Sequence, residues 1–103
     1  MTAQRALEKT ADQTGLAAIR EEIDRVDTEL LDALRRRMDC VRRVAEWKKE
    51  NGLPVRDRAR EETVVRRVRE NAGEEYADSA EKVYRALFDA ACAYEEKHME
   101  EKA

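Results

Sequence analysis

Hydrophobic residues recur at steps of three and four along the first half of the chain. This spacing is typical of an amphipathic helix, in which every third or fourth side chain lies on the same face. The residues of this stripe are Leu16, Ile19, Ile23, Val26, Leu30, Leu34, Met38, Val41 and Val44. No glycine or proline interrupts it before Gly52 and Pro54, which predict the end of the helix. We therefore expect a first helix over residues 15–50.

Two shorter stripes follow the proline. Val64, Val65 and Val68 predict a second helix over residues 58–71, with Asp57 in the position of its N-cap. The next stripe consists of Val83, Tyr84, Leu87, Phe88, Ala91 and Tyr94. It predicts a third helix over residues 79–100. Residues 1–13 carry no such pattern, and we interpret them as a mobile tail before a single helical domain over residues 14–103.

The first predicted helix is long for a chain of 103 residues. About 36 residues at ~1.5 Å each span ~54 Å, whereas a compact chain of this size has a radius of gyration of about 13 Å. Two shorter helices cannot cover the whole stripe, so a monomer would leave part of it in water. We expect an all-α fold with three helices per chain and an intertwined homodimer in which the long helices pack together.

Composition narrows the classes of function. Charged residues make up 44% of the chain and aromatic residues 5%, and three glycines and one proline provide too few turns for a sheet. A net charge of −3 argues against nucleic acid as a partner. We expect no membrane span, because no apolar run is long enough. The N-terminus lacks the apolar segment of a secretion signal, and two unpaired cysteines fit a reducing compartment, so we expect a cytoplasmic protein.

The inventory of reactive side chains is small. The chain has one histidine, His98, one serine, Ser79, and two distant cysteines, Cys40 and Cys92. These residues cannot form a zinc site of the usual spacing, and no glycine-rich motif is present that would hold a nucleotide. A Ser-His-Asp triad would require the single serine and the single histidine to meet. We predict that the protein uses no metal and no cofactor.

Several charged residues fall on the apolar faces. Arg37 and Lys48 are eleven residues apart, which places them within about 20° of each other around the helix. Arg60 and Glu61 stand one turn before the valines of the second stripe, where both can point inward, and Glu95 falls on the apolar face of the third. A buried carboxylate is costly unless it is paired or protonated. We interpret these residues as a pocket for a small polyanion, the alternative being cations that reach past the core to water.

The same residues belong to a more extended resemblance. Segments Leu16–Leu31, Arg35–Met38 and Gly52–Glu61, together with Lys48, are similar to the all-helical (AroQ-class) chorismate mutases, over about residues 15–97. The resemblance implies an isomerase that rearranges chorismate to prephenate, in the biosynthesis of phenylalanine and tyrosine. It also implies three helices per chain, an interlocked homodimer with two shared active sites, and no cofactor.

The resemblance implies which residues bind the two carboxylates of the substrate. Arg37 would hold one, and Arg20 of the partner subunit would hold the other, with Arg56 or Arg60 nearby. Guanidinium groups suit this role because their planar donors bind carboxylates in pairs. Ala91 stands where many members of the family have a serine that contacts a carboxylate.

The remaining roles concern the ether oxygen and the hydroxyl group of the substrate. Lys48 would donate a hydrogen bond to the ether oxygen. Glu95 stands where many members have glutamine, and it could donate to the same oxygen only when protonated, which requires a raised pKa. Glu61, with help from Asp57, would accept a hydrogen bond from the hydroxyl.

Three alternatives stay open. An isochorismate-pyruvate lyase shares the fold, and Arg35–Asp39 is similar to those enzymes, although Arg56–Glu61 follows the mutases better. An aminodeoxychorismate mutase would need few changed contacts. A non-catalytic helical dimerisation module is the third alternative, but apolar side chains would serve such a module better than inward charges.

Overall fold

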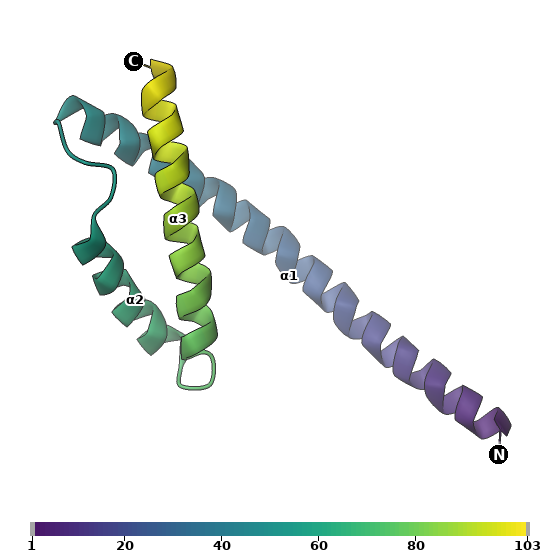
Figure 1. The fold of residues 1–103 in the computed structure, drawn as a ribbon. Coiled ribbons are helices and arrows are strands. Elements are labelled where there is room, and N and C mark those ends of the chain that lie inside the picture. Colours follow the sequence, from purple (N-terminus) through teal and green to yellow (C-terminus); the bar gives the residue numbers. More distant parts are fainter. Residues whose placement is uncertain (1, 103) are drawn as a thin grey trace. The chain divides into compact units, whose positions relative to one another are not determined.

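The computed structural model describes the backbone of residues 2–102 and the side chains of residues 15–100. It contains three helices, α1 (Thr2–Glu50), α2 (Arg58–Ala72) and α3 (Ala77–Lys102), as Figure 1 shows. No strand occurs among the described residues. The three helices predicted from the hydrophobic stripes, and the all-α fold class, are confirmed.

The largest difference from the sequence prediction is the beginning of α1. This helix begins at Thr2 and not near residue 15. Residues 2–14 include many good helix formers, and lengthening an existing helix requires no new nucleation, so a stripe is unnecessary there. The side chains of these residues lie outside the described part of the chain, and the mobility expected of residues 1–13 stays a prediction.

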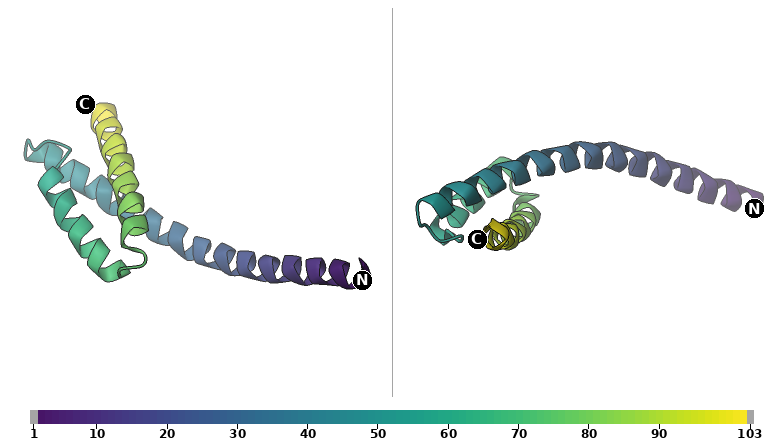
Figure 2. Two further views of the ribbon diagram at one scale, coloured as in Figure 1. Left: turned by 60° about the horizontal axis from the view of Figure 1, so that its bottom comes forward. Right: turned by 90° about the horizontal axis from the view of Figure 1, so that it is seen from above.

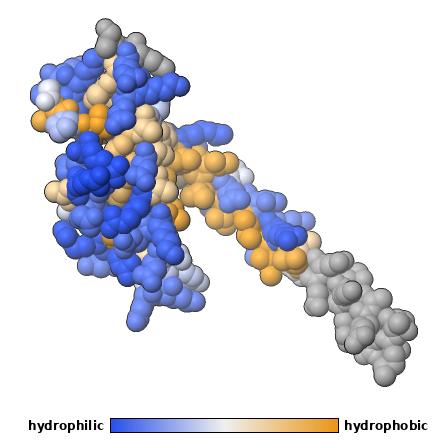
Figure 3. Space-filling view, in the orientation of Figure 1, coloured by the Kyte–Doolittle hydropathy of each residue, from blue (hydrophilic) through white to orange (hydrophobic). Residues whose placement is uncertain are grey.

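The chain divides into two compact units, residues 1–37 and 38–103. The first unit consists of the N-terminal part of α1. Most of its described large apolar side chains are 45–61% exposed, namely Leu16, Ile19, Ile23, Val26, Leu30 and Leu31, whereas Leu34 is half-buried. Figure 3 shows hydrophobic side chains in orange along the described part of this helix. The predicted stripe is therefore present, and in the single chain it is open to solvent.

The second unit contains the last turns of α1 together with α2 and α3. Helices α2 and α3 lie side by side and run in opposite directions (Figures 1 and 2). Val64, Val65 and Phe88 form the buried cluster between them, with Val68 and Tyr84 packed against it. The stripes that were predicted for these helices therefore face each other.

One member of the third stripe was assigned wrongly. Val83 is 57% exposed, whereas its neighbour Tyr84 packs edge-on against Phe88 with ring centroids 6.2 Å apart. Adjacent helical residues differ by about 100° around the axis, and Val83 lies beyond the face of α3 that Tyr84 and Phe88 present to α2.

The connection between α1 and α2 is fixed at both ends. Gly52 adopts a positive φ of 64° after the last turn of α1, a conformation that glycine adopts without steric cost. Asp57 is the N-cap of α2, as predicted, and its Oδ1 accepts a hydrogen bond from the Arg60 backbone N at 3.0 Å. These caps place Val55 and Arg56 on a short segment between two helix ends.

Candidate active site

A lysine and a buried glutamate meet in the second unit. Glu95, on α3, is 4% exposed, and its Oε1 lies 3.5 Å from Nζ of Lys48 in the last turn of α1. The same Lys48 nitrogen donates a hydrogen bond to the carbonyl oxygen of Val55. Lys48 therefore links α1, the segment before α2, and α3.

The surroundings of Glu95 favour its protonated form. Burial raises the pKa of this carboxyl group above its usual value, and the nearby positive charge of Lys48 partly opposes that rise. The direction predicted from the sequence is confirmed. A protonated carboxyl group can donate a hydrogen bond, which a carboxylate cannot.

A second ion-pair group lies in the same unit. Arg56 Nη2 donates to Glu61 Oε1 at 2.9 Å, and Arg56 Nη1 donates to Asp89 Oδ1 at 3.0 Å. Glu61 is 8% exposed, whereas the Asp89 side chain is 70% exposed. These hydrogen bonds, the one to Glu61 first, raise the pKa of Arg56. One guanidinium thus joins a buried carboxylate to an exposed one.

Cys92 connects the two groups electrostatically. Its side chain is half-buried on α3, and burial is the main cause of a raised thiol pKa. Smaller electrostatic contributions come from Arg56, Glu61, Glu95 and Lys48, so the thiol lies within range of all four charges. We call the five charged residues the charged centre: Lys48, Arg56, Glu61, Asp89 and Glu95.

Sequence analysis found four of these five residues but missed Asp89, and it did not connect Cys92 with them. Helical spacing is the one sequence signal that could have found them. Cys92 stands three residues before Glu95, and Asp89 stands three residues before Cys92, so they share a helix face. An exposed aspartate on a charged helix resembles any solvated residue. A cysteine on an apolar stripe resembles a small hydrophobic residue.

Three predicted site residues flank the charged centre. Ala91 is buried at 8% exposure, one turn before Glu95 on α3. Asp57 caps α2 and so fixes the first turn, which carries Glu61. Arg60 is exposed in the single chain, so the structure does not show the expected inward orientation, and its role in the site stays a prediction.

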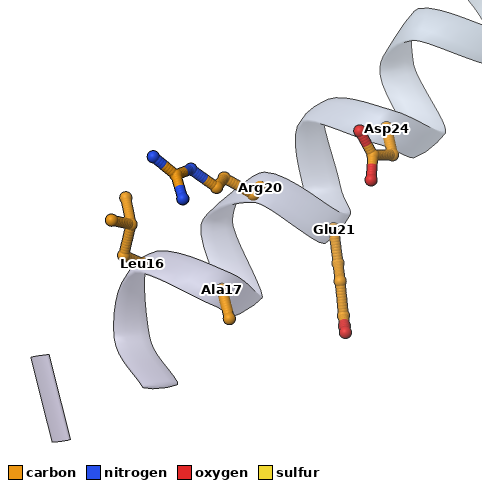
Figure 4. A pocket seen from close by; sticks show the side chains of 5 residues that line it. All are labelled: Leu16, Ala17, Arg20, Glu21 and Asp24. Carbon is orange, nitrogen blue, oxygen red and sulfur yellow. The ribbon is translucent and has the colours of Figure 1, made fainter. Parts of the chain in front are cut away.

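The two remaining predicted residues belong to the first unit. Arg20 is exposed, and Arg37 is half-buried. A shallow hollow is lined by Leu16, Ala17, Arg20, Glu21 and Asp24. Figure 4 shows that all five side chains come from α1, with Arg20 and Glu21 pointing in different directions. A single helix forms only one wall of such a hollow.

Neither a metal-binding cluster nor a membrane-crossing helix occurs among the described residues. In that part of the chain, no three histidine, cysteine, aspartate or glutamate side chains are arranged to hold a metal ion. No described helix combines the length and the apolar character that crossing a membrane requires.

Comparison with known proteins connects the chain to one protein family. Residues 19–96 match the family described as chorismate mutase type II. The chain is 31% identical over 88 residues to a chorismate mutase of Methanocaldococcus jannaschii, which covers 84% of this chain and 89% of that protein.

Two other curated proteins are similar over shorter segments. An isochorismate pyruvate lyase of Pseudomonas aeruginosa is 48% identical over 48 residues, which are 46% of this chain and 48% of that protein. A 3-dehydroquinate dehydratase of Pyrobaculum aerophilum is 42% identical over 62 residues, 60% of this chain but only 21% of that protein. No solved structure matches the chain.

Proposed function

The chain belongs to the type II chorismate mutase family, and we propose that it rearranges chorismate to prephenate at a site built on the charged centre. The observation that carries this proposal is the pairing of Lys48 with the buried Glu95. In the rearrangement, the ether C–O bond of the substrate breaks while a new C–C bond forms within the same molecule. No nucleophile, oxidant or cofactor takes part, in keeping with the small reactive inventory of the sequence.

Lys48 and Glu95 are suited to stabilise the ether oxygen. Negative charge grows on this oxygen as the C–O bond breaks, and donors already aimed at it lower the barrier. The Lys48 nitrogen and the Glu95 oxygen are 3.5 Å apart, so one substrate oxygen can lie within reach of both. The raised pKa of Glu95 favours the proton that this role requires.

Glu61 is suited to accept a hydrogen bond from the substrate hydroxyl. It is buried on the first turn of α2, which Asp57 fixes through its capping hydrogen bond. Ala91 adds an apolar wall one turn before Glu95. Together these residues restrict the substrate to a folded, reactive conformation, which supplies a further part of the rate enhancement.

The arginines are proposed to bind the two substrate carboxylates across a homodimer. Arg37 would bind one within its own chain, and Arg20 of the partner subunit would bind the other, with Arg60 near the entrance. Seventeen residues separate Arg20 from Arg37, or about 100° around the helix, so one α1 does not aim both at one substrate. The exposed apolar stripe of α1 supports a second copy, because such a surface gains stability when it is covered.

The wider biological setting is part of the same proposal. We place the reaction in the biosynthesis of phenylalanine and tyrosine and the protein in the cytoplasm. Isochorismate pyruvate lyase is the second candidate, because the Pseudomonas aeruginosa lyase is 48% identical over a local segment. The match to the Methanocaldococcus jannaschii mutase spans nearly twice as many residues and favours the rearrangement.

One experiment tests the activity. The purified protein is mixed with chorismate, the loss of chorismate absorbance is followed, and the product is identified by chromatography. We expect prephenate. A parallel reaction with isochorismate tests the lyase, and release of pyruvate there, without prephenate from chorismate, would replace the proposed function with the second candidate.

A further inference from the structure

We propose that Arg56 is a positioning residue that holds Glu61 in place, and that Asp89 anchors Arg56 from outside the site. This inference rests on the proposed function, in which Glu61 accepts a hydrogen bond from the substrate hydroxyl. It gives Arg56 a role different from binding a substrate carboxylate, which the sequence resemblance implied.

The hydrogen bonds of Arg56 leave its guanidinium directed at protein groups. Nη2 donates to Glu61 at 2.9 Å and Nη1 donates to Asp89 at 3.0 Å. The third nitrogen, Nε, is fully buried and has no hydrogen-bond partner among the described residues. Pairing through Nε is therefore closed to a substrate carboxylate, and each terminal nitrogen already donates one of its two N–H groups to a carboxylate of the protein.

Charge leads to the same conclusion. Arg56 carries one positive charge and contacts two carboxylates, so the group formed by Arg56, Glu61 and Asp89 has a net charge of −1 when all three are ionised. A dianionic substrate is repelled by such a group. By contrast, Lys48 faces a single carboxyl group whose pKa is raised, so the pair approaches a charge of +1 as Glu95 is protonated.

The positions of the three residues explain how Arg56 would act. Arg56 lies on the connection just before α2, Glu61 on the first turn of α2, and Asp89 on α3. Oε1 of Glu61 accepts from Arg56, so Arg56 fixes the rotation of the carboxylate, and we assign the substrate hydroxyl to Oε2. Asp89 is mostly exposed and can hold Arg56 without contacting a substrate in the buried part of the site.

The decisive variant is Asp89→Asn, which keeps the shape of the side chain and removes its charge. If Arg56 positions Glu61, kcat should fall roughly three- to tenfold while KM changes less than about twofold, because the loosened acceptor is misplaced in the transition state. If Arg56 instead binds substrate, the released guanidinium should lower KM. If the Arg56–Asp89 ion pair only stabilises the fold, Asp89→Asn should lower the melting temperature and leave kcat and KM unchanged. Either of these two results would overturn the inference.

Two further variants complete the test. Asp78→Asn is the matched control, because Asp78 is another exposed α3 carboxylate, 2.9 Å from a guanidinium of α2, Arg69. We expect its kcat and KM to equal those of the wild type. Asp89→Glu restores the carboxylate on a longer side chain and should recover most of the lost kcat.

A measurement without substrate separates this inference from the proposed function. The free energy of unfolding in urea is measured for the wild type, Arg56→Gln, Glu61→Gln and the double variant. The same four measurements are then repeated in the Asp89→Asn background. We expect coupling between Arg56 and Glu61 that weakens when Asp89 is replaced. If the wild type fails to consume chorismate, the proposed function is wrong, and coupling that does not respond to Asp89→Asn would then overturn the anchoring role independently.

Discussion

In the first unit the large apolar side chains of α1 are exposed, whereas in the second unit two carboxyl groups are buried. Leu30 is 61% exposed, while Glu61 and Glu95 are 8% and 4% exposed. Both arrangements cost free energy in the isolated chain, the first through apolar hydration and the second through desolvation of charge. The difference is instructive because each cost supports a different part of the proposed function: a second apolar surface on the first unit and a polar ligand in the second.

The two buried carboxyl groups also differ from each other. Glu61 forms a 2.9 Å hydrogen bond with a guanidinium, which compensates its charge and suits an acceptor. Glu95 pairs with a more distant lysine, at 3.5 Å, and its pKa is raised, which suits a donor. The proposed site thus assigns an acceptor role and a donor role to two glutamates, which are distinguished by their neighbours.

The largest expected effect concerns the lysine beside Glu95. Lys48→Ala should lower kcat/KM by roughly a hundredfold to a thousandfold, the range for loss of one preorganised donor. Lys49→Ala is the matched control, because the Lys49 side chain is exposed and donates a hydrogen bond to the Met99 carbonyl oxygen at 3.5 Å, outside the charged centre. Chorismate consumption measures both, with circular dichroism to check folding. Less than a tenfold loss in Lys48→Ala would contradict its proposed role.

The exposed stripe gives the next largest effect. Leu30→Asp should raise the dissociation constant of the homodimer by on the order of thirtyfold, because each copy loses about 1 kcal/mol of apolar burial. Thr28→Asp places the same charge away from the stripe and should change the constant little. Sedimentation equilibrium measures both. A wild-type protein that is monomeric at micromolar concentration would remove the basis of this prediction.

Much of the fold could be predicted from the sequence because helical periodicity and breakers are local signals. The stripe of α1, the cap at Asp57 and the positive φ at Gly52 follow from neighbouring residues. The beginning of α1 could not be predicted from the stripe, since residues 2–14 form helix without one. Val83 was assigned wrongly because periodicity alone does not set the width of a buried face.

For the candidate site, success depended on whether the signal was local. Glu61 and Glu95 were predicted because each falls on an apolar face next to buried residues. Asp89 could not be predicted, since its partner Arg56 is 33 residues away in the chain and the contact exists only after α2 and α3 pack. The exposure of Arg60 could not be predicted for a different reason. Spacing allows two adjacent residues to point inward, as Val64 and Val65 do, but it does not show that Arg60 and Glu61 differ in burial.

A mixing experiment tests whether the first unit serves a site on a second copy. Arg20→Ala and Arg37→Ala should each be nearly inactive as homodimers. After subunit exchange, half of the dimers should contain one chain of each kind, with one intact site of two, so activity should recover to about a quarter of the wild-type value. Mixing Arg37→Ala with Lys48→Ala is the control, because both changes are proposed to act within one chain. If verified exchange restores no activity in the first mixture, Arg20 does not act across the dimer.

The smallest expected effect is the most specific test of Glu95. Because burial raises its pKa and a donor must be protonated, wild-type kcat/KM should fall as the pH rises through that pKa. The groups that face this carboxyl are the ammonium of Lys48, which opposes the rise, and the thiol of Cys92 on the same helix. Glu95→Gln provides an amide donor at every pH, so it should flatten the alkaline fall and exceed the wild type by a few-fold there.

Two controls make the Glu95 test decisive. Glu95→Ala has no hydrogen-bond donor at this position, so its kcat/KM should be low at every pH. This variant separates the effect of hydrogen bonding from that of side-chain volume. Stability should follow the same titration: a carboxyl group with a raised pKa in the folded state stabilises the protein below its unfolded pKa, and this contribution is lost as the pH rises through the folded pKa. The free energy of unfolding should therefore decline with pH more steeply in the wild type than in Glu95→Gln over that window. Superimposable activity and stability profiles for these two proteins would mean that titration of Glu95 governs neither property, and the predicted alkaline fall would be wrong.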